Sequence, residues 1–174
     1  SWSLLSIGVY LSYQNYQNNY FSNWSIITLA LASRLVLINT PYSDDLYRYI
    51  WEGRVVLEGL NPYLISPNSE SLNYLVIQFT DLSNIRNLIN HPNLPAIYPP
   101  VSQYILSFFS YFSHNPQRLQ NVFQLIELSL LLGVYKLIKQ HNLPFRNLLL
   151  YSFNPIILIY LVSEAHLDII GVSF

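Results

Sequence analysis

Long apolar stretches separated by a single polar loop dominate this sequence. Segments of membrane or near-membrane length cover residues 2–13, 21–39, 119–138 and 147–162. About 20 apolar residues are needed for a helix to cross the hydrocarbon core of a bilayer. The pattern therefore predicts an all-α fold, a multi-pass transmembrane helical bundle. Pro41 ends the second segment, because proline cannot continue a helix.

The polar loop begins at Pro41, and more than half of the charged residues lie between it and Pro95. This loop divides the chain into three parts. We predict N-terminal transmembrane helices in residues 1–40, a loop with juxtamembrane helices in 41–118, and further transmembrane helices in 119–174.

The positive charges predict which side of the membrane the loop occupies. Lys136, Lys139 and Arg146 bracket the connection after segment 119–138, and cytoplasmic loops collect lysine and arginine. This places the connection inside and the polar loop outside. Only segment 119–138 is long enough to cross between them. The apolar segment 97–112 is therefore expected to stay outside as a juxtamembrane or re-entrant helix.

Composition agrees with a membrane protein, because charged residues make up 10% of the chain against about 25% in soluble domains. The net charge of −1 argues against a nucleic-acid partner. Cysteine is absent, which excludes disulfides and thiolate metal sites. Methionine is also absent, and Ser1 and Phe174 lie inside apolar runs, so we expect a fragment of a longer protein.

Local signals predict a helix from Asp44 to about Glu58. Ser43 is a good N-cap, and Asp44 lies in the first turn, where a carboxylate is favoured by the helix dipole. Gly59 occupies the position of a C-cap glycine, and the Asn61-Pro62 turn follows.

One face of this helix carries Asp44, Arg48 and Glu52 at i, i+4 spacing. Capping and surface ion pairs alone would explain such a face. The position of the acids beside the outer end of an apolar segment favours a functional role.

Several sequence blocks resemble those of a known family. They are SDDLYRYIWEGR at 43–54, GLNPY at 59–63, NHP at 90–92, IYPP at 97–100 and EAHLD at 164–168. In this order the chain resembles bacterial GT-C membrane glycosyltransferases, in particular the polyprenyl-phosphomannose-dependent mannosyltransferases, from about Arg34 to its last residue. Glu52 stands where aspartate is frequent in the family, which leaves the sugar specificity open.

The resemblance implies a GT-C fold in the bacterial plasma membrane, with the active site on the extracytoplasmic side. It implies a polyprenyl-phosphate-linked sugar as donor, with mannose or another hexose as the sugar. A glycan or lipid is the implied acceptor, membrane lipids are further partners, and inversion at the anomeric carbon is expected.

The chemistry requires a base for the proton of the acceptor hydroxyl. Asp44 is the first choice, while Asp45 points to another side of the helix and is expected to orient the loop, bind a cation or act as the alternative base. Arg48, Arg54 or Arg86 would supply donors to the departing phosphate.

The predicted substrate-binding set further includes Glu52, Asn61, His91 and Tyr98. For His91, a substrate contact and a hydrogen bond within the loop are both open.

A second polar cluster consists of Glu164, His166 and Asp168, where segment 147–162 should emerge on the outer side. Ionisable groups at membrane depth are usually functional. Donor or acceptor binding is preferred over a metal site, because the cluster has only one histidine. A solvent-exposed helix start capped by acids is the structural alternative. No cofactor is assigned, and a divalent cation is left open.

Arg34 and Glu127 are the charges furthest from any loop. A buried unpaired charge is costly, so we predict a structural contact between them.

Two other functional classes are compatible with the sequence. A transporter or lipid flippase would use Asp44 and Asp45 to bind a coupling ion. A non-catalytic assembly partner would not need Asp44 as a base.

Overall fold

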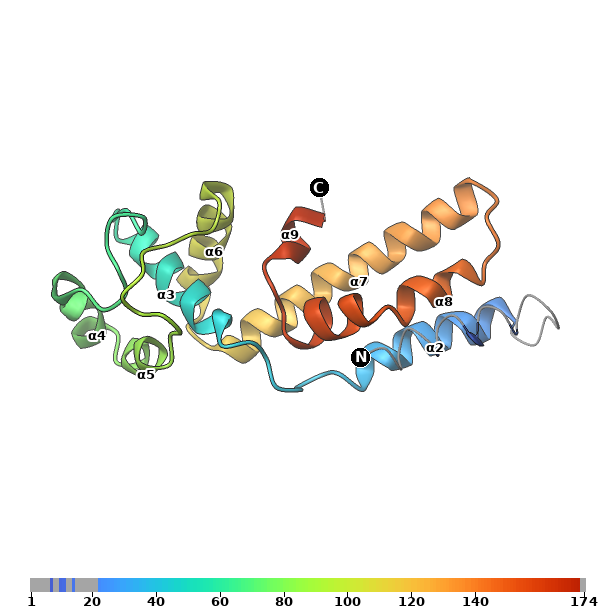
Figure 1. The fold of residues 1–174 in the computed structure, drawn as a ribbon, viewed down its shortest axis with the longest axis horizontal. Helices are drawn as coiled ribbons and strands as arrows, with labels where there is room; N and C mark the ends of the chain where they lie inside the picture. Colours follow the sequence, from blue (N-terminus) through green and yellow to red (C-terminus); the bar gives the residue numbers. More distant parts are fainter. Residues whose placement is uncertain (1–6, 8–9, 12–13, 15–21, 173–174) are drawn as a thin grey trace. The chain divides into compact units, whose positions relative to one another are not determined.

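The computed structural model describes residues 7, 10, 11, 14 and 22–172, and every regular element among them is a helix (Figure 1). The predicted all-α class is confirmed for this part of the chain. The chain forms two compact units. We call residues 1–41 and 120–174 the terminal unit and residues 42–119 the central unit.

Within residues 22–41 and 120–172 of the terminal unit, the structure describes four helices and most of a fifth. They are α2 (Asn23–Leu35), the greater part of α7 (Pro116–Gln140), α8 (Asn147–Ser152), the π-helix η2 (Ile156–Ser163) and α9 (Asp168–Val172). Ile26 and Ala30 of α2 pack with Leu131 of α7 and with Leu148 and Leu149 of α8 to form its buried core.

Helix α7 is the only described helix that is long and apolar enough to cross a membrane. Its 25 residues correspond to about 37 Å at the rise of an α-helix. Only 28% of its most apolar stretch is buried, whereas a core helix of a soluble protein is mostly buried. The predicted helix over 119–138 is confirmed, and the multi-pass bundle stays a prediction.

The other apolar segments form shorter helices than predicted. Segment 21–39 yields the 13 residues of α2 followed by turns, in which Asn39 has a φ of 60°. Segment 147–162 is broken between α8 and η2, because Pro155 cannot continue α8 and the Asn154 side chain accepts the Ile156 N–H at 2.9 Å. Segment 2–13 falls largely outside the described residues.

The central unit contains α3 (Asp45–Leu57), the 3₁₀-helix η1 (Glu70–Leu72), α4 (Asn73–Gln78), α5 (Asp81–Asn87) and α6 (Pro100–Phe112). Helices α3 and α6 pack closely at Gly53, where an added Cβ would lie 2.5 Å from the carbonyl oxygen of Leu106. The 13 residues of α6 are too few to cross a bilayer as an α-helix.

Helix α3 begins and ends within one residue of the predicted limits, Asp44 and about Glu58. The Ser43 hydroxyl accepts the Asp45 N–H at 3.2 Å. At the other end Gly59 has a φ of +73° and donates its N–H to Val56 at 3.0 Å, while Leu60 donates to Val55 at 3.1 Å. This pair of hydrogen bonds is a Schellman motif, which satisfies carbonyls of the last turn.

Candidate functional site

Asp44 and Asp45 stand at the start of α3 but have different surroundings. Asp44 is exposed, and no described residue forms a hydrogen bond or ion pair with its carboxylate. Asp45 is half-buried, and its carboxylate accepts the Asn90 side-chain amide at 2.9 Å. Asp45 thus orients the loop, one of the roles predicted for it. The carboxylate of Asp44 is accessible to a ligand.

Arg48 uses all five of its N–H donors inside the central unit. Its Nε donates to Glu52 at 2.8 Å, one terminal nitrogen donates to the carbonyls of Asn90 and His91, and the other donates to those of Leu94 and Pro95. A guanidinium has five donors. In this conformation none is left for a phosphate, and Arg48 instead holds residues 90–95 against α3.

Glu52 lies in the core of the central unit, with 2% of its surface exposed. Its second carboxylate oxygen accepts the Gln103 side-chain amide at 2.6 Å. Burial raises the pKa of Glu52, and the hydrogen bonds from Gln103 and Arg48 oppose part of this increase. The carboxylate predicted to bind substrate is enclosed by protein here.

Arg86 also serves the fold. It donates to the carbonyls of Pro67 and Ser69 at 2.8 and 2.9 Å and to the Asn73 side chain at 2.8 Å. Burial lowers its pKa, and its guanidinium lies 5.3 Å from the ring centre of Trp51.

Arg54 leaves more of its N–H donors unused than Arg48 and Arg86 do. It pairs with Glu58 one turn later and stacks on Phe79, with 3.8 Å between the guanidinium carbon and the ring centre. Its remaining terminal nitrogen has no hydrogen-bond partner among the described residues. Of the three arginines predicted to contact phosphate, Arg54 therefore has the most N–H donors without a hydrogen-bond partner in the part of the chain that the structure describes.

Asn61 and Tyr98 take part in the turns around α3 and α6. The Asn61 side chain accepts the Tyr63 N–H at 2.9 Å, and the Tyr63 hydroxyl donates to the carbonyl of Tyr98. The Tyr98 ring meets that of Tyr49 edge to face at 5.1 Å, and burial raises the pKa of Tyr98 to about 12. These contacts give both residues a structural task.

His91 is exposed, with a φ of 48°, and its carbonyl accepts hydrogen bonds from Leu94 and Arg48. The hydrogen bonds of its backbone fix the loop, and its imidazole is accessible. Substrate contact by this side chain stays a prediction.

The second predicted cluster lies in the terminal unit, after the end of η2. Glu164 and His166 form a pair at 3.0 Å, and the imidazole stacks on Tyr160 with ring centres 3.8 Å apart. Asp168 is exposed at the start of α9. Among the described residues no three histidine, aspartate or glutamate side chains are grouped as metal ligands.

The predicted Arg34–Glu127 contact is confirmed. Both nitrogens on one side of the guanidinium donate to the carboxylate, at 2.8 and 3.2 Å, and both side chains are buried. Arg34 also donates to Ser33 and to the carbonyls of Ala30 and Ser152.

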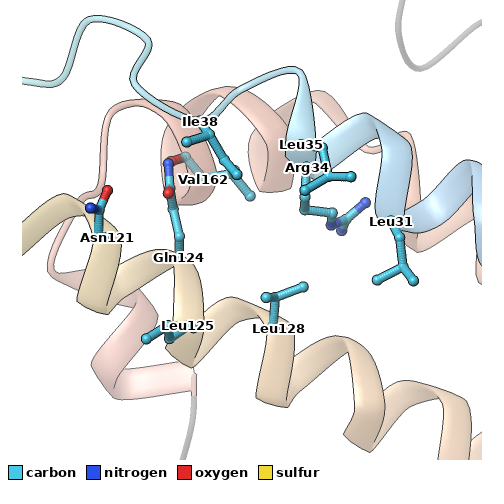
Figure 2. Close-up of a pocket in the computed structure, with 9 residues that line it drawn as sticks. All are labelled: Leu31, Arg34, Leu35, Ile38, Asn121, Gln124, Leu125, Leu128 and Val162. Carbon is cyan, nitrogen blue, oxygen red and sulfur yellow. The ribbon is translucent and has the colours of Figure 1, made fainter.

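An apolar cavity of about 390 Å³ lies beside this pair in the terminal unit (Figure 2). Leu31 and Leu35 of α2 and Leu125 and Leu128 of α7 contribute to its lining. Arg34 also lines it, but its donors are occupied by Glu127 and nearby groups, so the surface offered to a ligand is mainly apolar.

A polar cavity of about 630 Å³ in the central unit was not predicted from the sequence. Its lining includes Tyr42, two residues before Asp44, and a histidine–aspartate pair in which His114 Nδ1 lies 2.9 Å from an oxygen of Asp81. These residues are far apart in sequence. The only local signal was the short polar break Ser113-His114-Asn115 between two apolar segments.

Comparison with protein-family models, with curated proteins and with solved structures finds no match to this chain.

Proposed function

We propose that the chain is part of a multi-pass membrane glycosyltransferase that moves a hexose from a polyprenyl phosphate to a glycan or lipid acceptor outside the cytoplasm. The observation that carries the proposal is the exposed carboxylate of Asp44, which has no partner among the described residues and starts the helix of the polar loop. The similarity of this loop to the GT-C blocks supports it. The long, largely exposed apolar helix α7 supports a membrane location.

In the proposed reaction Asp44 takes the proton of the acceptor hydroxyl as its oxygen attacks the anomeric carbon. The bond from that carbon to the phosphate oxygen breaks, and the polyprenyl phosphate leaves with the electron pair. The attack comes from the face opposite the leaving group, so the configuration inverts. Arg54, which keeps donors free, would contact the phosphate.

The test is transfer from a panel of polyprenyl-phosphate sugars by the full-length protein, with Asp44→Asn, Asp45→Asn and Glu70→Gln variants. Glu70 is a matched control, because it is an exposed acid of the same unit. We expect a loss of about 100-fold or more for Asp44→Asn, as for a missing general base, and little change for Glu70→Gln. Undiminished turnover in both aspartate variants would remove the proposed base.

A transporter or flippase is the second candidate, and one observation favours it. The apolar segment 147–162 is interrupted between α8 and η2, as in the discontinuous helices of transporters. This candidate requires flux of a lipid or solute across proteoliposomes without sugar transfer. Transfer without flux would exclude it.

A further inference from the structure

We propose that the polar cavity of the central unit binds a neutral sugar unit of the acceptor. The inference rests on the proposed function, because it names the acceptor class for the same site. The cavity volume of about 630 Å³ is within the range of small-molecule sites. Most of its lining side chains are polar, with one carboxylate, one guanidinium, one imidazole and several hydroxyls among them.

The charges in the lining favour an uncharged ligand. Asp81 and Arg118 contribute one negative and one positive charge. A phosphate site needs an excess of positive charge and a cation site an excess of negative charge. A sugar hydroxyl both donates and accepts, so it uses a carboxylate and a guanidinium together.

The hydrogen-bonding groups of both charged residues are available. His114 holds one oxygen of Asp81 at 2.9 Å and so fixes the carboxylate, while the Asp81 side chain remains 62% exposed. Arg118 is exposed, and its guanidinium has no partner among the residues that the structure describes. The lining thus presents one oriented acceptor and a set of unused donors.

Two tyrosines of the lining provide aromatic rings against which a sugar ring can pack. Tyr42 and Tyr111 line the cavity, and the negative face of an aromatic ring attracts the weakly positive C–H groups of a sugar. Burial and a hydrogen bond with the Tyr47 side chain raise the pKa of Tyr42 to about 12, so its hydroxyl stays protonated.

The cavity is also close to the proposed base. Tyr42 lines it and precedes Asp44 by two residues, a distance of at most about 7 Å along an extended chain. A sugar bound beside Tyr42 would therefore bring a hydroxyl near the Asp44 carboxylate. This proximity identifies the ligand as acceptor.

The test is binding of α-linked mannobiose to the full-length protein, measured by saturation-transfer NMR in a zwitterionic detergent without a sugar headgroup. We expect Arg118→Gln and Asp81→Asn to raise the dissociation constant about tenfold or more, as for lost charge-assisted hydrogen bonds. Glu70→Gln is the control and should bind as the wild type does. Arg118→Gln is the safer variant, because this exposed side chain has no described partner to lose.

Several results would overturn the inference. They are no binding by the wild type, equal binding by both cavity variants, or equal weakening by the control. Displacement of mannobiose by inorganic phosphate would instead indicate an anion site. Failure of the proposed function can be distinguished from failure of this inference. If only the proposed function were wrong, mannobiose would still bind through Arg118, but no sugar would be transferred from any polyprenyl phosphate. Asp44→Asn should lose transfer and keep binding.

Discussion

The two units each bury an arginine against a glutamate, but they satisfy the guanidinium in different ways. In the terminal unit Arg34 of α2 binds Glu127 of α7 through two hydrogen bonds, so the pair connects helices distant in sequence. In the central unit Arg48 and Glu52 lie one turn apart on α3 and share one hydrogen bond. The other four donors of Arg48 go to backbone carbonyls of residues 90–95.

The difference shows that the same two residue types can join two helices or fasten a loop. The structural role of such an arginine depends on which groups accept the N–H donors that do not bind the glutamate. A buried guanidinium needs an acceptor for each of its donors. A functional interpretation of a conspicuous arginine therefore depends on its backbone partners as well as its carboxylate.

The largest expected effect is that of Arg48→Met. The substitution leaves Glu52 buried without its cation and four carbonyls without a donor. Breaking a buried pair on one side costs about 3–5 kcal/mol, and the lost carbonyl contacts place this variant at the upper end. Unfolding of the full-length protein in mixed micelles measures it. Arg118→Met, at an exposed position, is the control and should change stability by less than about 0.5 kcal/mol.

Arg34→Met should cost somewhat less, about 3 kcal/mol, because it leaves two backbone carbonyls without this donor where Arg48→Met leaves four. The double variant Arg34→Met/Glu127→Met should recover most of the loss, since removing both charges leaves no unpaired ion. The same measurement of unfolding applies. If the double variant were as unstable as the single one, the pair would not be the source of the effect.

Gly53→Ala tests the close packing that buries the Arg48 pair. The added Cβ would meet the backbone of Leu106 on α6, so the helices must separate. We expect a loss of about 1–3 kcal/mol. Gly133→Ala in α7 is the matched control, because nothing lies within 4 Å of its Cβ position. The control should be neutral or stabilise by up to about 1 kcal/mol. Equal losses would contradict the steric explanation.

The smallest effect concerns pH. Burial raises the pKa of Glu52 in the folded protein, so the folded state binds more protons than the unfolded state between the two pKa values. The resulting gain in folding stability is fully present below the pKa that Glu52 has in the unfolded chain. It is lost as pH rises through the pKa that Glu52 has in the folded protein. The stability of the wild type relative to Glu52→Gln should therefore increase on acidification from about pH 8 to about pH 4. A relative decrease would show that the pair with Arg48 outweighs burial.

Local and charge-based arguments predicted part of the structure well. The limits of α3 followed from Ser43 and Gly59, because caps act over a few residues. The Arg34–Glu127 pair followed from the cost of burying either charge alone. Among the candidate site residues, Asp45 forms a hydrogen bond with Asn90 of the loop, which agrees with one of its three predicted roles, and the roles themselves stay predictions.

Other features could not be predicted because they depend on tertiary contacts. Nothing in the sequence shows that Arg48 binds four carbonyls, since any residue supplies the same carbonyl group. The break after α8 depends on a side-chain hydrogen bond of Asn154 that hydropathy does not register. Asp81 and His114 meet only in the folded central unit, so the polar cavity has no sequence pattern.

The attachment of residues 90–95 to Arg48 has a consequence for variation in this segment. The guanidinium recognises carbonyls alone, and His91, Leu94 and Pro95 are exposed. Their side chains can therefore be exchanged with little loss of this anchorage, whereas deleting a single residue would shift every carbonyl out of register. At these three positions the segment tolerates changes of identity, whereas the segment as a whole does not tolerate a change of length.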